Sequence, residues 1–345
     1  MMRATVLPRF GAPGVFTCEA VTRPEPRADQ FLVRVAACGI CGHDLLNRQG
    51  AFPLTKLPAV IGHEISGTVE KVGALITRFK PGDRVALNQR MSCGVCNACR
   101  DGRSNVCREG YGFYGEDVSG GYGEYVVATE RNAILLPDGI DFVVGAVLSC
   151  AVGTGFHALG RARVKPGDSV VVTGAGGGVG LHTVQLAHDM ACRVIAITTS
   201  DAKKASIRAA GADDVVVSPD LQFHGAVKAL TGGLGAAAVI EITGAPTFPS
   251  SIKALCSGGR LVVVGNVQPG NVAFNPAVGI LKEVELVGSS HATLDDLVRV
   301  ADLVQRGRVR PEIAEIIDVQ DAAAGHALME GKVTTGRVVL RGFGV

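Results

Sequence analysis

The sequence contains no tryptophan, and aromatic residues make up only 5% of its 345 residues. Its formal net charge is only +2 and basic clusters are few, which argues against nucleic acid or an anionic membrane surface as a partner. No apolar stretch reaches the roughly 18 residues that a membrane-spanning helix needs. We therefore expect a protein that binds neither nucleic acid nor membrane.

The first residues also lack the apolar core of a secretory signal peptide. Because the sequence nevertheless contains ten cysteines, we expect a reducing, cytoplasmic environment in which clustered thiols bind metal rather than form disulfides. Apolar residues make up 47% and charged residues 19%, which is enough for a sizeable core. The length is ordinary for two domains.

Two parts of the chain differ in pattern. Up to about residue 150, short β-branched runs alternate with turn signals and helical periodicity is lacking, which predicts a compact β domain with long loops. From about residue 153, apolar runs recur every 20 to 25 residues between alanine-rich, helix-like segments. Runs that are apolar throughout predict a parallel sheet covered by helices. A further strand, at 337–340, is expected to rejoin the β domain.

Four cysteines lie within fifteen residues, and two or seven residues separate each from the next: Cys93, Cys96, Cys99 and Cys107. Short Cys-x2-Cys steps allow one loop to surround a zinc ion with four thiolates. The surrounding segment has no long apolar run that would bury four unrelated thiols. The spacing predicts a structural zinc lobe at about residues 90–110.

A glycine-rich turn follows the apolar run at 170–173, and a helical pattern follows the turn. Its residues are Gly174, Gly176, Gly177, Gly178, Val179 and Gly180. Glycines let the backbone approach a pyrophosphate, and the helix N-terminus offers free N–H groups to its charge. The spacing departs from G-x-G-x-x-G, since valine stands at 179, but the strand–turn–helix context predicts a dinucleotide site.

The next strand should end beside the ribose of the dinucleotide. An acidic residue there favours NAD, because it accepts hydrogen bonds from the ribose 2′-OH and repels a 2′-phosphate. Here the residues are Thr198, Thr199 and Ser200, followed by Lys203. Hydroxyls and a cation favour NADP(H), although Asp201 between them leaves NAD(H) open.

A second possible metal set is dispersed along the chain. Cys41 and His63 lie in the β domain, and Cys150 lies where the two patterns meet. Two thiolates and one imidazole would leave a fourth position open, as a catalytic zinc requires. Spacing alone does not bring these residues together, so buried structural cysteines remain the alternative.

Several motifs resemble one family over essentially the whole chain. They are 38–44 (Cys-Gly-Ile-Cys-Gly-His-Asp), 62–64 (Gly-His-Glu), the four-cysteine lobe, 120–126 (Gly-Gly-Tyr-Gly-Glu-Tyr-Val), 154–156 (Thr-Gly-Phe) and the glycine turn. Together they resemble the zinc-dependent medium-chain dehydrogenase/reductase superfamily, the family of alcohol dehydrogenases. The resemblance implies an α/β protein with a GroES-like β catalytic domain at 1–152 and 289–345. It also implies a Rossmann domain, with a doubly wound parallel sheet, at 153–288.

The resemblance also implies roles for single residues. Cys41, His63 and Cys150 would hold the catalytic zinc, one of two zinc ions per chain. Glu64 would lie beside that zinc, and Asp44 would orient the ligand histidine. Arg337 would pair with Glu64 and is also assigned to the cofactor site. The other cofactor residues implied are Thr154, Val264, Gly265 and Asn266.

One departure from the family concerns proton transfer. Family members usually have serine or threonine where His43 stands, and some continue the relay through a histidine where Leu46 stands. We hypothesise that His43 itself receives the proton, since histidine as a residue type titrates near neutral pH. The alternative is a histidine turned outward or bonded to a phosphate or backbone group.

The implied reaction is hydride transfer between a nicotinamide and an alcohol/carbonyl pair, with zinc as the Lewis acid. The alternative is NADPH-dependent reduction of an activated C=C bond, because 172–186 and 258–267 resemble acryloyl-CoA and quinone reductases. A non-enzymatic dinucleotide-binding protein is a third, weaker possibility. Family members are usually dimers or tetramers, with 281–287 as the expected contact. The loop 47–57 and the aromatic residues Phe52, Phe113 and Tyr114 are expected to line the substrate pocket.

Overall fold

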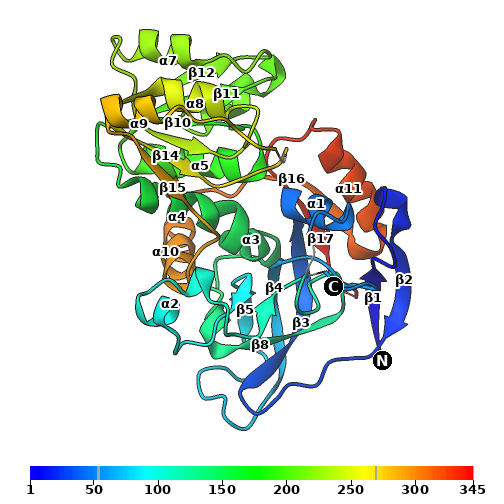
Figure 1. The fold of residues 1–345 in the computed structure, drawn as a ribbon. Helices are drawn as coiled ribbons and strands as arrows, with labels where there is room; N and C mark the ends of the chain where they lie inside the picture. The colour runs from blue at the N-terminus through cyan, green and yellow to red at the C-terminus, as the bar shows by residue number, and fades with distance from the viewer. Residues whose placement is uncertain (53–54, 269, 345) are drawn as a thin grey trace. The chain divides into compact units, whose positions relative to one another are not determined.

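The computed structural model describes residues 1–52, 55–268 and 270–344. The described chain divides into two compact units. The first comprises 1–153, 291–307 and 313–345, and the second comprises 154–290 and 308–312. Each has its own sheet and its own buried apolar cluster (Figure 1).

The first unit is built on a mixed sheet in the order β16-β17-β3-β4-β5-β9, with β8 paired to β3. The strands are β3 (Gln30–Ile40), β4 (Glu64–Val72), β5 (Arg84–Leu87), β8 (Tyr125–Thr129), β9 (Ala133–Leu135), β16 (Ile313–Asp318) and β17 (Arg337–Arg341). Two hairpins add β1 (Met2–Val6) with β2 (Thr17–Val21), and β6 (Arg90–Met91) with β7 (Gly112–Phe113). The predicted return of the strand near 337–340 is confirmed, since β17 pairs antiparallel with β3.

Helices in the first unit are more numerous than its sequence pattern suggests. They are α1 (Gly42–Arg48), α2 (Asn97–Arg100), α3 (Phe142–Val147), the π-helical turn η4 (Leu148–Val152), α10 (Leu294–Gln305) and α11 (Ala322–Glu330). Short 3-10 turns lie at η1 (Pro13–Val15), η2 (Ser104–Val106), η3 (Glu130–Asn132) and η6 (Val319–Asp321). Before residue 142 the helices are one or two turns long, too short for the 3.6-residue period to appear in the sequence.

The second unit is a parallel sheet in the order β12-β11-β10-β13-β14-β15. Its strands are β10 (Ser169–Val172), β11 (Arg193–Thr198), β12 (Asp214–Val217), β13 (Ala236–Glu241), β14 (Leu255–Val263) and β15 (Glu285–Gly288). In chain order this is 3-2-1-4-5-6, the doubly wound arrangement whose switch point lies between β10 and β13. The prediction of a parallel sheet is confirmed.

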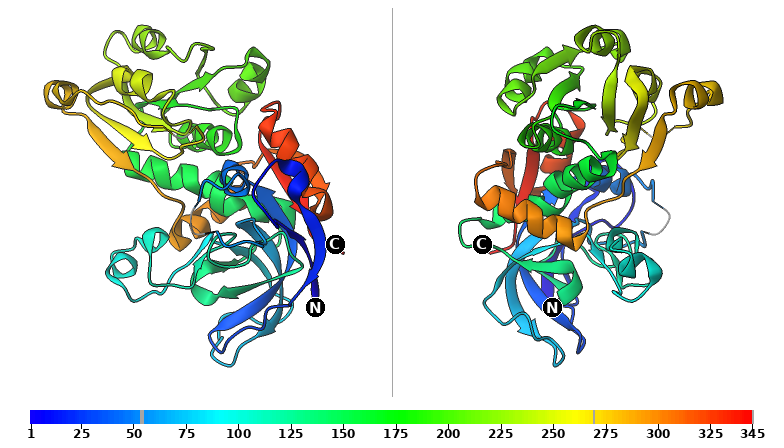
Figure 2. Two further views of the ribbon diagram at one scale, coloured as in Figure 1. Left: turned by 45° about the vertical axis from the view of Figure 1, so that its right-hand side comes forward. Right: turned by 90° about the vertical axis from the view of Figure 1, so that its left-hand side faces the viewer.

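Helices pack against both faces of this parallel sheet (Figures 1 and 2). They are α4 (Gly153–Ala162), α5 (Gly178–Asp189), α6 (Lys204–Ala209), α7 (His224–Leu230), α8 (Phe248–Ala254) and α9 (Pro276–Lys282), with the 3-10 turn η5 at Asp201–Lys203. Coverage of both faces explains why the central strands are apolar throughout. Val170, Val171 and Val172, for example, are fully buried.

The expected domain limits differ from the structural units at residue 153, at 289–290 and at 308–312. Residues 308–312 were expected in the β domain, but they belong to the second unit. Arg308 pairs with Asp189 at 2.6 Å, and the backbone N–H of Glu312 donates to Nε2 of His182 at 2.8 Å. Both partners lie on α5, so side chains of this helix hold the segment, and no local pattern in 308–312 reveals it.

Contrary to the expectation that no apolar stretch reaches the length of a membrane span, the helical stretch Phe142–Ala162 is long and apolar enough to cross a membrane by length and composition. However, 72% of its most apolar window is buried inside the structure, as is usual for a core helix. The apolar character of this stretch is thus accounted for by packing.

Candidate active site with two metal-ligand sets

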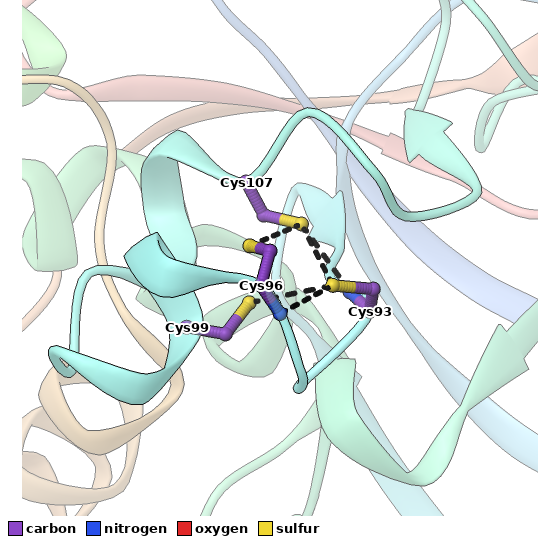
Figure 3. A group of neighbouring side chains, drawn as sticks. All are labelled: Cys93, Cys96, Cys99 and Cys107. Atoms are coloured by element: carbon purple, nitrogen blue, oxygen red, sulfur yellow. Dashed lines mark hydrogen bonds between the residues drawn. The ribbon is translucent and has the colours of Figure 1, made fainter.

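The four cysteines of the predicted lobe converge around one point in the first unit (Figure 3). All four Sγ atoms lie within 4.8 Å of one another. Cys93 and Cys107 are separated by 3.6 Å, and Cys96 and Cys107 by 3.8 Å. A disulfide would require about 2.04 Å, whereas a tetrahedron with Zn–S bonds of about 2.3 Å has edges of about 3.8 Å. The arrangement therefore fits a structural zinc ion.

Backbone amides in the lobe support the thiolate form that binds zinc. Sγ of Cys93 accepts the N–H groups of Val95 at 3.4 Å and Cys96 at 3.3 Å. These hydrogen bonds lower the pKa of Cys93 to about 6. The N–H of Cys93 in turn donates to Sγ of Cys107 at 3.3 Å. The loop is thus folded around the sulfur atoms.

The dispersed metal set also converges, within the first unit alone. Ligand atoms of Cys41, His63, Glu64 and Cys150 all lie within 4.8 Å of one another. Cys41 is the N-cap residue of α1, and Cys150 lies in the π-helical turn η4. Such turns are frequent at functional sites. The two sulfur atoms are 3.7 Å apart, again close to the edge of a zinc tetrahedron.

Asp44 links two of these ligands. One of its carboxylate oxygens accepts the backbone N–H of Cys41 at 2.8 Å, and the other lies 3.1 Å from Nδ1 of His63. Because Nδ1 is engaged, Nε2 of His63 is left for a metal ion. Burial opposes a charged imidazole, but Asp44 and Cys41 raise the pKa of His63 well above its ordinary value overall. The Cys150 thiol hydrogen-bonds to Cys41 and lowers the pKa of Cys41.

Glu64 and Arg337 are brought together by the strand register. Gly39 on β3 pairs with Glu64 on β4, and a Cβ added at Gly39 would lie 2.1 Å from a Glu64 carboxylate oxygen. Arg337 Nη2 lies 3.0 Å from that carboxylate, and its Nη1 donates to the Ile40 carbonyl at 3.2 Å. Burial raises the pKa of Glu64 to about 7, against the opposing effect of Arg337. Neither Glu64 oxygen has a hydrogen bond in the described structure.

His43 is neither turned outward nor bonded to a backbone group. Its Nε2 lies 2.5 Å from a carboxylate oxygen of Glu116, and its ring stacks on Phe52 with centroids 4.2 Å apart. Phe113 lies 5.3 Å from both His43 and His63, centroid to centroid. Of the expected aromatic wall, Phe52 and Phe113 border the metal ligands. Tyr114 instead belongs to the buried core, where its hydroxyl donates to the Val127 carbonyl at 2.7 Å.

Positions 53 and 54 of the loop expected to line the substrate pocket lie outside the described residues. Thr154 is buried in the first turn of α4.

The glycine turn lies at the carboxyl end of β10, at the switch point of the parallel sheet. Gly174 has a left-handed φ of 60°, and a Cβ on Gly180 would lie 2.2 Å from the Gly174 carbonyl oxygen. A larger residue at Gly180 would therefore clash with the backbone of the turn, and one at Gly174 would be strained. The helix α5 starts at Gly178, so the N–H groups of its first turn, including those of Val179 and Gly180, are directed toward the approach of an anion.

The residues expected to discriminate between NAD(H) and NADP(H) follow β11. Thr198 is buried, and its hydroxyl accepts the Ser200 N–H at 3.2 Å, while Thr199 is exposed. The side chain of Lys203 lies over the glycine turn, because a Cβ on Gly176 would be 2.6 Å from its Cδ. Partial burial lowers the pKa of Lys203. A lysine side chain beside the turn favours a phosphate ligand.

A buried carboxylate that the sequence did not single out organises the same region. Glu241 ends β13 and accepts five hydrogen bonds in the described structure. The donors are the hydroxyl of Thr173 at 2.9 Å, the N–H groups of Thr243 and Gly244 at 2.9 Å each, the hydroxyl of Thr247 at 2.6 Å and the hydroxyl of Ser251. Its own carbonyl accepts the N–H groups of Val264 and Gly265, and Asn266 lies against Gly244. Glu241 thus ties the glycine turn to the loops at 242–247 and 264–266.

The candidate residues therefore form three groups: the four-cysteine lobe, the dispersed metal set with Asp44, His43 and Arg337, and the dinucleotide turn with its neighbours. Arg337 contacts Glu64, and its assignment to the cofactor site stays a prediction. Glu116 and Glu241 were missed, because neither lies in a recognisable motif and each acts through residues distant in sequence.

Both units of the chain are similar to known proteins. Residues 27–138 match the alcohol dehydrogenase GroES-like domain, and residues 178–306 match the zinc-binding dehydrogenase domain. Acryloyl-coenzyme A reductase from Metallosphaera sedula is 33% identical over 93% of this chain and 94% of its own length. Alcohol dehydrogenase from Schizosaccharomyces pombe is 31% identical over 98% of this chain and 97% of its own length. The crystal structure of AibC is 40% identical, with a TM-score of 0.93, and the match covers 99% of this chain and 95% of that one.

These matches span both units and include enzymes of more than one substrate class. The chain belongs to the zinc-dependent medium-chain dehydrogenase/reductase superfamily, the family of the alcohol dehydrogenases, and is an oxidoreductase with a GroES-like domain and a Rossmann domain.

Proposed function

We propose that this oxidoreductase reduces a C=C bond conjugated to a carbonyl, such as that of an acryloyl thioester. A hydride from NADPH adds to the β-carbon and a proton adds to the α-carbon, so that the alkene is reduced and the dinucleotide is oxidised. The observation that carries this proposal is the His43–Glu116 pair, which stands where an alcohol dehydrogenase has a hydroxyl.

Alcohol oxidation in this family passes a proton from the alcohol to a serine or threonine hydroxyl. This chain has His43 at that position and Leu46 where a second relay residue stands in some relatives. An imidazole held by a carboxylate is instead suited to supply a proton to a nascent carbanion. The full-length relative from Metallosphaera sedula, an acryloyl-coenzyme A reductase, supports the same reaction class.

The chain's own residues have distinct tasks in this reaction. Cys41, His63 and Cys150 would hold one zinc ion, and the four-cysteine lobe would hold a second. When bound, the first ion would act as a Lewis acid on the carbonyl oxygen of the substrate. Asp44 keeps the imidazole of His63 in the tautomer that leaves Nε2 for metal. The first turn of α5 binds the pyrophosphate, and Lys203 favours NADP(H).

A second candidate is interconversion of an alcohol and a carbonyl compound, the reaction ranked first on sequence alone. The specific observation in its favour is the complete donor set of Cys41, His63 and Cys150, with Asp44 and Glu64 beside it. Delivery of hydride to an alkene does not itself require a metal. A zinc ion is more directly suited to an alcohol or an unconjugated carbonyl.

The two candidates separate in one assay. Oxidation of NADPH and NADH is followed at the absorbance of the reduced nicotinamide with acryloyl-CoA, simple aldehydes and ketones, and reduction of the oxidised forms is followed with alcohols. We expect the largest kcat/KM with acryloyl-CoA and NADPH. A larger kcat/KM with an alcohol or aldehyde would overturn the proposal.

The metal set is tested by substitution. Cys41→Ser should abolish activity. Cys18→Ser, which changes an exposed thiol, is the matched control and should not.

We also propose that copies of the chain associate through the edge strand β15 and the adjacent helix α9. Leu281 and Leu286 are 82% and 55% exposed there, and β15 has no strand beyond it in the described sheet. Light scattering should give a dimer or tetramer, and Leu281→Glu should lower the mass. Leu234→Glu, at another exposed leucine of the same unit, should not. A monomeric wild-type protein would contradict this proposal.

A further inference from the structure

His291 lies beside the dispersed metal set, although no motif drew attention to it. It belongs to the first unit, between β15 and α10. Its ring centroid lies 4.8 Å from that of Phe113, and Phe113 lies 5.3 Å from His63 and from His43. A single ring therefore separates His291 from a metal ligand.

The ring nitrogens of His291 are not engaged by the protein. His63, His43 and His326 each have a hydrogen-bond partner, but no hydrogen bond or ion pair reaches His291 from the described part of the chain. The ring is half-buried, and neither ring nitrogen is among the buried side-chain atoms of the described residues that lack a partner, so both are open to solvent or to a ligand. Burial, together with the nearby histidines and Arg90, lowers the pKa of His291 to about 3. The imidazole is therefore neutral at working pH, with one N–H donor.

The backbone of His291 is also unusual. Its φ is 52°, in the left-handed region that a residue with a side chain adopts at a cost in strain. Contact with Phe113 fixes the ring, and the left-handed backbone sets the direction in which the side chain leaves the chain. Strain of this kind tends to persist where a side chain is needed in one orientation.

We propose that His291 donates a hydrogen bond to the carbonyl oxygen of the substrate at the Cys41–His63–Cys150 site and so selects for carbonyl compounds that present this oxygen. The proposal rests on the proposed function of that site. A carbonyl oxygen has two lone pairs, so it can accept an N–H while it faces a Lewis acid. Of the histidines that contact Phe113, His43 is paired with Glu116 and His63 with Asp44, which leaves His291 for the substrate.

Two substitutions separate the donor from the backbone strain. Asparagine and glycine both tolerate a left-handed φ, but only asparagine has a side-chain N–H. Binding of propionyl-CoA and of butanone to the zinc-loaded enzyme with NADP+ is measured by calorimetry, and steady-state kinetics are measured with acryloyl-CoA. We expect His291→Gly to raise Kd and KM about 10-fold or more, and His291→Asn to restore both to within about 3-fold of wild type.

Zinc content and Tm are measured on the same samples. Equal binding by wild type and His291→Gly would overturn the proposal, as would equal losses in the asparagine and glycine variants. Loss of zinc in His291→Gly would overturn it in favour of a role in metal positioning. If the wild-type enzyme turns over acryloyl-CoA while the glycine variant binds normally, only the role of His291 fails. If wild type binds neither carbonyl compound, the proposed function fails as well.

Discussion

One carboxylate oxygen of Asp44 lies 3.1 Å from Nδ1 of His63, and both side chains are almost completely buried. The other oxygen of Asp44 accepts the Cys41 N–H, so one side chain positions two metal ligands. We therefore expect metal binding at this set to depend on a residue that is not itself a ligand.

Asp44→Asn should weaken zinc binding at the dispersed set by about 10- to 100-fold. Asparagine has only one acceptor oxygen, so either the Cys41 N–H or the His63 N–H loses its partner. Zinc per chain after dialysis against a chelator should fall from two to one. Asp101→Asn, at an exposed carboxylate of the cysteine lobe, should keep both ions. Equal retention by the two variants would contradict the role of Asp44.

Loss of one thiolate from the lobe should affect stability more than chemistry. Cys107→Ser removes a sulfur that contacts Cys93 and Cys96, so one zinc ion per chain should be lost. We expect Tm to fall by about 5–10 °C, the change that a few kcal/mol produces in a unit of this size. Activity per folded molecule at low temperature should remain within about 3-fold of wild type, because Cys107 belongs neither to the dispersed metal set nor to the glycine turn. An unchanged Tm with full loss of activity would contradict a structural role for the cysteine lobe and would indicate that the lobe takes part in the chemistry instead.

Lys203→Ala should weaken NADPH binding about 10-fold, equivalent to about 1.4 kcal/mol. The aliphatic part of this side chain packs against Gly176, and the residue follows β11, where the 2′-phosphate of NADP(H) is expected. Binding of NADH should change less than about 2-fold, since NADH lacks the 2′-phosphate. Dissociation constants from nicotinamide fluorescence would measure both. Lys204→Ala is the matched control, and an equal loss for NADH and NADPH would contradict the phosphate contact.

Glu241→Ala should destabilise the second unit by about 3 kcal/mol, because five donors lose a buried acceptor at once. Dinucleotide affinity should fall with it, since Thr173 directly precedes the glycine turn. Urea unfolding and cofactor titration test both effects. Glu285→Ala, which removes a partly exposed partner of Arg260, should cost no more than about 1 kcal/mol.

His43→Ala should lower kcat by about 10²- to 10⁴-fold if this side chain carries the proton. Glu116→Gln should give a smaller loss, because the amide still accepts or donates one hydrogen bond to the ring. NADPH affinity should stay unchanged in both variants. If His43→Ala turns over near the wild-type rate, His43 does not carry the proton.

Local spacing and non-local register explain which parts of the site could be predicted. The four-cysteine lobe and the glycine turn each lie within a short segment, so sequence spacing alone indicates their chemistry. Cys41, His63 and Cys150 meet only because strand pairing and a π-helical turn bring distant segments together, and they were assigned through a family resemblance. Glu116, Glu241 and His291 lie outside every motif and were found only from three-dimensional contacts.

The fold, like the site, was predictable where a local sequence pattern determines it and not where contacts between distant segments do. The apolar strands of the second unit are recognisable because both of their faces are buried. By contrast, residues 308–312 were placed in the wrong unit, because they are held by side chains of α5 rather than by a pattern of their own. Short helices such as α1 and α2 span too few residues to establish a period.

Arg337 lies 297 residues after Ile40, to whose carbonyl it donates, and it is the cation paired with the buried Glu64. During synthesis the segment around Glu64 leaves the ribosome long before this arginine does. Until β17 docks, a carboxylate next to a metal ligand has no counter-ion, and its burial is opposed by desolvation. We therefore expect the dispersed metal set to be completed only after β17 has been synthesised, whereas all four cysteines of the lobe are available once residue 107 has left the ribosome.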